Sequence, residues 1–223
     1  MSVIDERTAP VPIDKVKEEG ESQAFIPYPP IGKDLEHVPI HVRPDVLYYL
    51  QRMTFFPNAI KLYLHVPWIA EHLFRLNNSI MRDERNGLSE HFKYRLALVA
   101  SYENECPYCV SHHACTLKRR WEYGDDKLAK VIEEEPPADE REAVAMEFVR
   151  QASRNDAGVT DELRARLAQH FTPQEVMEIV LVTGFWKMYN MMHVAMAVPI
   201  EDPVQEYRRW VEHGKGTGDK VVC

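Results

Sequence analysis

The sequence predicts an all-α fold in a single domain, a helical bundle preceded by an extended, proline-rich N-terminal arm. Apolar residues recur with the spacing of one helix face along most of the chain. Ser, Thr and Pro stand where such segments begin, as caps and first helical residues do. No alternating apolar and polar residues flank an Asn-Gly or Asp-Gly turn, so hairpins are not expected. A chain of 223 residues, 45% of them hydrophobic, can bury a sizeable core.

The arm comes first in chain order. Residues 1–44 contain seven of the 15 prolines, which fix φ and remove backbone donors, so this stretch is expected to be extended. Two alternatives remain open: a disordered leader, or an arm that packs on the body or on a neighbouring subunit. Phe25, Ile26 and Tyr28 favour packing, because apolar side chains gain by burial.

The first helices follow the arm. A short amphipathic helix is expected over residues 43–53, and a longer helical stretch over residues 57–81. Pro67 lies inside the longer stretch, so a kink or break is expected just before it. Ser89 then caps a helix over residues 90–105.

The clearest helix lies in the second half of the chain. Thr172 is its expected cap, Pro173 takes the first helical position and Glu175 completes a capping box. The other helices expected after the cysteine segment cover residues 125–135, 138–153, 160–171 and 202–214. The predicted organisation is therefore an arm over 1–44, a helical domain over 45–212 and a flexible tail over 213–223.

Charge and composition exclude several classes of protein. The formal net charge of −8 argues against a nucleic-acid partner, which calls for a basic face. No apolar run reaches the length of about 18 residues that a membrane span needs. The first residues lack the apolar core of an export signal, so we expect a cytoplasmic protein. In that reducing compartment a close cysteine pair is typical of catalysis or metal binding.

The chemistry concentrates in residues 103–115, which contain three of the four cysteines and two of the ten histidines. Pro107 suits the first position of a helix that starts at Cys106. A helix N-terminus stabilises a thiolate, and Cys109, three residues on, is close enough to form a disulfide. His113 lies one helical turn after Cys109 and is placed to take its proton. The cluster therefore predicts a redox centre.

Two other interpretations stay open for the same cluster. Zinc could bind Cys106, Cys109 and His113, with Cys115 or His112 as a fourth ligand, although structural zinc sites usually draw on two separated segments. Alternatively, these are small buried cysteines beside surface histidines. A glutaredoxin is excluded by context, because its Cys-Pro-Tyr-Cys follows a strand, whereas a helix is expected before this one.

The segment "CPYCVSHH" after an amphipathic helix resembles the carboxymuconolactone decarboxylase-like superfamily, and most closely its alkylhydroperoxidase D-like, peroxidase-related branch. "MYNMMHVAMAVPIED" is similar to the closing segment of that branch, with Asn190 and Pro199 in the matching places. The resemblance covers roughly residues 45–202. It implies the alkylhydroperoxidase D-like helical fold.

The resemblance also implies roles for the matching residues. Cys109 would attack a hydroperoxide, Cys106 would resolve the sulfenic acid as a disulfide, and His113 would belong to the proton relay. A small thiol or a thiol protein would then reduce the disulfide. Proteins of this kind usually self-associate, so a homo-oligomer is expected, a trimer or a dimer-based assembly. No cofactor and no metal is implied.

The chain departs from that pattern at two relay positions. The family commonly has a glutamate twelve residues before its first cysteine, and Tyr94 occupies this place. Tyr94, Glu103 and Glu105 are the candidates to replace it. Alkylhydroperoxidase D also has a histidine between its cysteines, where this chain has Tyr108. Weak peroxidase activity, a different thiol-redox task, or an interaction scaffold with a decayed site are therefore the remaining alternatives.

Several other residues have an ordinary structural interpretation. Cys115 is expected to be buried and structural, Cys223 to be incidental, His112 to lie at a surface or interface, and His193 to be a helix-end histidine. The stripe formed by Phe185, Trp186, Met188, Tyr189 and Met192 is expected to be core or subunit interface first, and the wall of a pocket for an apolar hydroperoxide second.

Overall fold

The described part of the chain is helical, as predicted. The computed structural model describes residues 24–32, 35–53, 55–132, 139–154 and 158–207. Its helices are α1 (Arg43–Arg52), α2 (Asn58–Tyr63), α3 (Pro67–Arg82), α4 (Glu90–Glu103), α5 (Pro107–Trp121), α6 (Asp125–Ile132), α7 (Glu140–Ser153), α8 (Asp161–His170), α9 (Pro173–Ala195) and the 3₁₀ helix η3 (Asp202–Tyr207).

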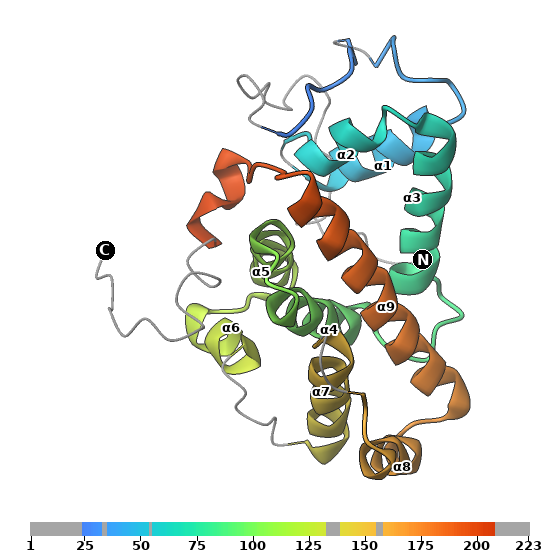
Figure 1. The fold of residues 1–223 in the computed structure, drawn as a ribbon, viewed down its shortest axis with the longest axis vertical. Coiled ribbons are helices and arrows are strands. Elements are labelled where there is room, and N and C mark those ends of the chain that lie inside the picture. Colours follow the sequence, from blue (N-terminus) through green and yellow to red (C-terminus); the bar gives the residue numbers. More distant parts are fainter. Residues whose placement is uncertain (1–23, 33–34, 54, 133–138, 155–157, 208–223) are drawn as a thin grey trace.

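Helix α4 occupies the centre of the bundle, where α5, α7 and α9 pack around it (Figure 1). Eleven of its residues are buried, because apolar or small side chains follow one another on all of its faces from Leu96 to Tyr102. Ser89 caps it by accepting a hydrogen bond from the Phe92 N–H at 3.2 Å, as predicted. The cysteine segment begins directly after this central helix, so the position of α4 sets the position of that segment.

Helix α9 crosses α4 and supplies one side of the candidate site (Figure 1). Its start is the predicted capping box, in which Thr172 and Glu175 exchange hydrogen bonds. Deeper in the helix, Asn190 accepts a hydrogen bond from the Ser101 hydroxyl of α4 at 3.1 Å. This buried polar contact sets the position of α9 along α4.

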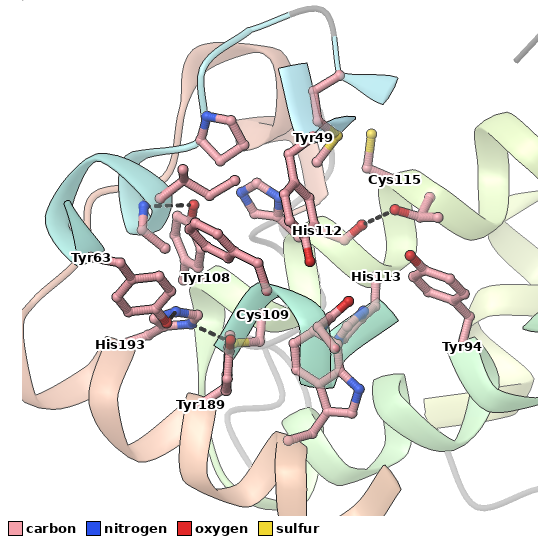
Figure 2. Close-up of a pocket in the computed structure, with 18 of the residues that line it drawn as sticks. Tyr49, Tyr63, Tyr94, Tyr108, Cys109, His112, His113, Cys115, Tyr189 and His193 are labelled. Atoms are coloured by element: carbon pink, nitrogen blue, oxygen red, sulfur yellow. Dashed lines mark hydrogen bonds between the residues drawn. The ribbon is translucent and has the colours of Figure 1, made fainter. Parts of the chain in front are cut away.

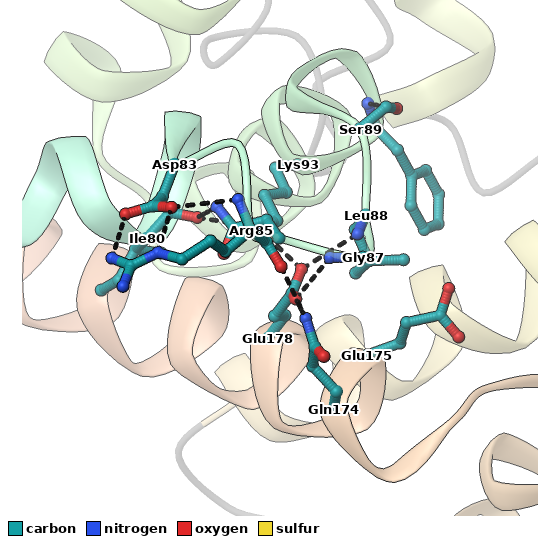
Figure 3. Close-up of polar contacts among 12 residues, drawn as sticks. Ile80, Asp83, Arg85, Gly87, Leu88, Ser89, Lys93, Gln174, Glu175 and Glu178 are labelled. Carbon is teal, nitrogen blue, oxygen red and sulfur yellow. Dashed lines mark hydrogen bonds and ion pairs between the residues drawn. The ribbon is translucent and has the colours of Figure 1, made fainter.

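A buried ion pair joins α4 to α9 and to the loop that precedes α4 (Figure 3). The Lys93 ammonium lies 2.8 Å from the Glu178 carboxylate and donates to the Ile80 carbonyl. The same carboxylate accepts hydrogen bonds from the N–H groups of Gly87 and Leu88 at 2.7 and 3.0 Å. Two opposite charges can be buried here because nearly every lone pair and proton has a partner.

The N-terminal segment packs on the body where it is described. Phe25 donates its N–H to the Met196 carbonyl after α9 at 3.1 Å. Ile26 and Tyr28 lie against the cluster of buried residues that contains Cys106 and Cys109. The alternative of a packed arm therefore holds for Ile26 and Tyr28, whereas the Phe25 side chain is 77% exposed, and residues 1–23 of the arm lie outside the described part of the chain.

The chain breaks before Pro67 as predicted, between α2 and α3. The last segment differs from the prediction: a 3₁₀ helix replaces the α-helix over Asp202–Tyr207. Residues 208–214 of that prediction, the acidic run 133–135 and the tail over 213–223 lie outside the described residues, and the domain boundaries stay predictions. Among the described helices, none combines the length and the apolar character that crossing a membrane requires.

Candidate active site

Cys106 and Cys109 lie at the start of α5. Cys106 is the N-cap, and its Sγ accepts the N–H of Cys109 at 3.4 Å. Pro107 occupies the first turn, where its missing N–H costs nothing. Glu105 makes the turn from α4 with a φ of 54°, in the left-handed region. The predicted helix start at the cysteine pair is therefore present, and both cysteines lie at the helix N-terminus, which carries a partial positive charge.

The imidazole that contacts the pair comes from α9, not from α5. Nδ1 of His193 lies 2.9 Å from Sγ of Cys109, and its Nε2 contacts the Tyr63 hydroxyl at the end of α2 (Figure 2). Because this hydroxyl can donate to Nε2 or accept from it, either ring nitrogen can carry the proton. The ligand atoms of Cys106, Cys109 and His193 all lie within 4.8 Å of one another.

The two thiols differ in acidity. A hydrogen bond from the Cys109 thiol, helped by His193 and by the Cys109 N–H, lowers the pKa of the Cys106 thiol to about 5. Burial, followed by the hydrogen bond and charge of Cys106, raises the pKa of Cys109. Cys106 is therefore the more acidic thiol of the pair.

The described hydrogen bonds of Cys106 and Cys109 do not include His113. His113 is buried and packs edge-on against Trp186, with 4.1 Å between ring centroids. Its Nε2 has no hydrogen-bond partner among the described residues. Burial, with the nearby His112, His193 and Arg82, lowers the pKa of His113 to about 3, so the ring is neutral. The contact predicted for His113 with Cys109 is made by His193 instead.

None of the three candidates to replace the relay glutamate contacts a cysteine sulfur in the described contacts. The Tyr94 hydroxyl contacts the Arg82 guanidinium. The Glu103 carboxylate accepts hydrogen bonds from Arg150 and Arg154, each at 2.9 Å. Glu105 is exposed in the turn before Cys106. Glu103 is thus directed at α7, which carries Arg150 and is followed by Arg154, and away from the cysteine pair.

A buried carboxylate that the sequence did not single out lies beside the site. Glu201 accepts a hydrogen bond from the Tyr108 hydroxyl at 2.8 Å and pairs with His112 at 2.7 Å. Burial raises its pKa, but the charge and hydrogen bond of His112 outweigh this, so the pKa of Glu201 is lowered. His112 is accordingly partly buried and paired, and the expectation that it lies at a surface or interface stays a prediction. These contacts hold η3 and the segment before it on α5.

A cavity of about 180 Å³ opens beside Cys109 and His193 (Figure 2). Aromatic rings from α1, α2, α3, α4 and α9 form much of its wall: Tyr49, Tyr63, Phe74, Tyr94, Trp186 and Tyr189. Cys109 lines the cavity, whereas Cys106 is not among the described lining residues. A molecule in the cavity would therefore meet the sulfur of Cys109 first.

The remaining predicted residues divide between core and cavity. Cys115 is buried, as expected, and it also lines the cavity. In the α9 stripe, Phe185 lies in the core, Trp186 and Tyr189 line the cavity, and Met188 is exposed. Cys223 lies outside the described residues. Sequence spacing could not reveal His193, although it stands three residues after Asn190 in the closing segment already noted.

The fold and the cysteine segment together define the class: the chain has the fold of the alkylhydroperoxidase D-like, peroxidase-related proteins. No family model matches the sequence. The chain is similar to an uncharacterised protein of Escherichia coli K12, YnjA, with 23% identity over 78% of this chain and 93% of the relative.

Two solved structures illustrate the likeness of fold. One is an uncharacterised peroxidase-related protein of Ralstonia eutropha JMP134 with an alkylhydroperoxidase AhpD core, with a TM-score of 0.69, 20% identity and coverage of 86% of this chain and 97% of that one. The other is the debrominase Bmp8 in complex with 2,3,4-tribromopyrrole, with a TM-score of 0.70, 20% identity and coverage of 86% and 100%. The fold thus accommodates more than one chemistry.

Proposed function

We propose that the chain is a thiol oxidoreductase that reduces hydroperoxides, or exchanges disulfides, with the Cys106–Cys109 pair. The 2.9 Å contact between Cys109 Sγ and His193 Nδ1, with Cys106 beside them, carries the proposal. It joins a nucleophile, a base and a resolving thiol, the parts that this chemistry needs. The likeness of fold to peroxidase-related proteins supports it.

The first step takes place at the cavity wall. Cys109 passes its proton to Nδ1 of His193 and, as a thiolate, attacks the hydroperoxide. The O–O bond breaks, leaving a sulfenic acid on Cys109 and an alkoxide that takes the proton from His193. The geometry supports this assignment because Cys109 lines the cavity and contacts the imidazole.

The second step uses the acidity of Cys106. Its thiolate attacks the sulfur of the Cys109 sulfenic acid, so an S–S bond forms and hydroxide leaves as water after protonation. An external dithiol then reduces the disulfide and is itself oxidised. His193 and the Cys109 N–H also lower the pKa of the Cys106 thiol, and both are present after Cys109 is oxidised, which supports this role. The reducing cytoplasm, where such dithiols are kept reduced, is the proposed location.

The direct test measures consumption of cumene hydroperoxide and of hydrogen peroxide with dithiothreitol as reductant. We expect Cys109→Ser to abolish consumption, and Cys106→Ser to accumulate a sulfenic acid on Cys109 that dimedone traps. Cys223→Ser is the matched control and should keep the full rate. An unchanged rate in both Cys109→Ser and Cys106→Ser would remove the proposal, and the interaction scaffold with a decayed site would take its place.

A second candidate function is zinc binding by Cys106, Cys109 and His193, favoured by their mutual distances. His193 takes the place that the sequence suggested for His113. The group found in the described residues offers three ligands, whereas structural zinc takes four. One zinc per chain in protein purified without added metal, retained during dialysis against a weak chelator, would favour this function over the redox one.

The proposal includes self-association through α9. Its outer face is apolar yet exposed, through Met177, Val180, Leu181, Met188, Met191 and Val194. These residues recur every three or four positions, and a Cβ on Gly184 between them would meet nothing within 4 Å. A second copy of the chain is the proposed cover for this face, because a large exposed apolar stripe is unfavourable in water.

A further inference from the structure

The cavity beside Cys109 has unpaired polar atoms in its wall. Nε2 of His113, Nε1 of Trp186 and the hydroxyl of Tyr189 are buried, and each lacks a hydrogen-bond partner among the described residues. All three side chains line the cavity. Buried polar groups are nearly always paired in native proteins, so three unpaired polar atoms in the lining of one cavity point to a ligand that binds there.

These three side chains are contiguous. The ring centroids of His113 and Trp186 lie 4.1 Å apart, and those of Trp186 and Tyr189 lie 5.6 Å apart. Tyr189 in turn lies 5.6 Å from the His193 ring at the thiol end. Because an indole N–H can only donate, the ligand group at this place has to be an acceptor.

Positively charged side chains also line the cavity. Arg82 and Arg120 both pair with the carboxylate of Glu90, so two guanidiniums share one negative charge. Arg82 and Arg120 line the cavity, and no Asp or Glu is among its described lining residues. The Tyr94 hydroxyl contacts Arg82, and the ring centroids of Tyr94 and His113 lie 5.9 Å apart. The surplus charge therefore adjoins the unpaired atoms and favours an anion.

We infer that the cavity binds a small aromatic carboxylate, with its ring among the aromatic side chains and its carboxylate oxygens accepting hydrogen bonds from Trp186 and His113. The inference rests on the proposed function and deepens it. The aromatic carboxylate would be the substrate, and the group on it that is reduced would face Cys109. Flat aromatic walls such as Tyr49 and Tyr189 suit a planar ring, and the arginine pair selects the anion over a neutral analogue.

The test is a binding experiment that does not depend on turnover. The Cys106→Ser/Cys109→Ser double variant is titrated with benzoate, with benzamide as the neutral isostere, and with acetate as the anion without a ring, and binding is followed by NMR. Benzoate should bind at least about tenfold more tightly than either, since a charged hydrogen bond and a ring contact each contribute about that much. Equal binding of benzoate and benzamide, or no binding, would overturn the inference.

Two variants locate the site. Trp186→Phe, which keeps a ring and removes the donor, should weaken benzoate binding about tenfold. Glu90→Gln, which frees the arginine pair, should strengthen it, an effect that a merely structural role would not produce. Trp68→Phe, at an exposed tryptophan, is the control and should change nothing. Benzoate binding without any peroxidase activity would refute the proposed function alone, and activity without benzoate binding would refute this inference alone.

Discussion

Sγ of Cys109 on α5 lies 2.9 Å from Nδ1 of His193 on α9, although 84 residues separate them in the chain. The contact is possible because α5 and α9 both pack on α4. Cys109 lies in the first turn of α5 and His193 in the last turn of α9, so these two helix ends meet. It places a base at the nucleophile from a helix that the cysteine motif does not include.

Replacing His193 tests the role of this base. His193→Asn should lower the rate of peroxide consumption by at least about a hundredfold, the range expected for a lost general base. His170→Asn, at the end of α8, is the control and should keep the rate. If His113→Asn abolishes the rate and His193→Asn does not, the relay runs through α5 as the sequence indicated, and the contact seen here has no catalytic part.

The acidity of Cys106 predicts a pH profile for the thiol pair. Since the pKa of Cys106 is lowered to about 5, one thiolate per chain should be present at neutral pH and should disappear on acidification with a midpoint near pH 5. Ultraviolet absorbance of the thiolate follows this directly. In Cys109→Ala the midpoint should rise, because the side chain that donates to the Cys106 sulfur is removed. A midpoint above pH 8 in the unaltered protein contradicts the assignment.

The Lys93–Glu178 pair predicts a pH-dependent contribution to stability. Glu178→Gln should reduce the free energy of unfolding at pH 7 by about 3 kcal/mol, because it leaves a buried ammonium without its counter-charge. Burial raises the pKa of Glu178, but hydrogen bonds from Lys93 and the loop outweigh this and lower it below 4.5. The native contribution is therefore complete above pH 4.5 and is lost as the pH falls through the lowered pKa.

Urea unfolding at several pH values measures this difference. The two proteins should converge as the pH falls below 4.5, because protonation then neutralises Glu178 in the unaltered protein as well. Glu84→Gln, at an exposed position, is the control and should change the free energy by no more than about 0.5 kcal/mol. A difference between Glu178→Gln and the unaltered protein that does not depend on pH contradicts the prediction.

The exposed face of α9 predicts self-association. Met191, which is 61% exposed, lies in the middle of the C-terminal half of this face. Met191→Glu should shift the sedimentation coefficient towards that of a monomer, because a carboxylate resists burial in an apolar interface. Gln169→Glu on α8 adds the same charge at an exposed site and should leave the assembly intact. A monomeric unaltered protein would refute the proposed interface.

Much of the fold could be predicted because helix starts are encoded locally. Ser89 and Thr172 act within one turn of chain, and so does the break before Pro67. The 3₁₀ helix at Asp202–Tyr207 was missed, because the choice there depends on tertiary contacts. Glu201, immediately before it, is held by residues from α2 and α5 that lie about ninety or more positions away.

The candidate site likewise has features that depend on local sequence and features that depend on tertiary contacts. The sequence by itself determined the cysteine pair, its place at a helix start and the helical class of the chain, since all three depend on neighbours within a turn or two. Only the tertiary structure decided that His193 rather than His113 contacts Cys109, and that Cys106 is the more acidic of the two thiols. Both outcomes depend on the position of α9, which crosses the bundle and places His193 beside the buried cysteines. The four-residue spacing of Cys109 and His113 describes one helix only, so it cannot predict a contact with a side chain on another helix.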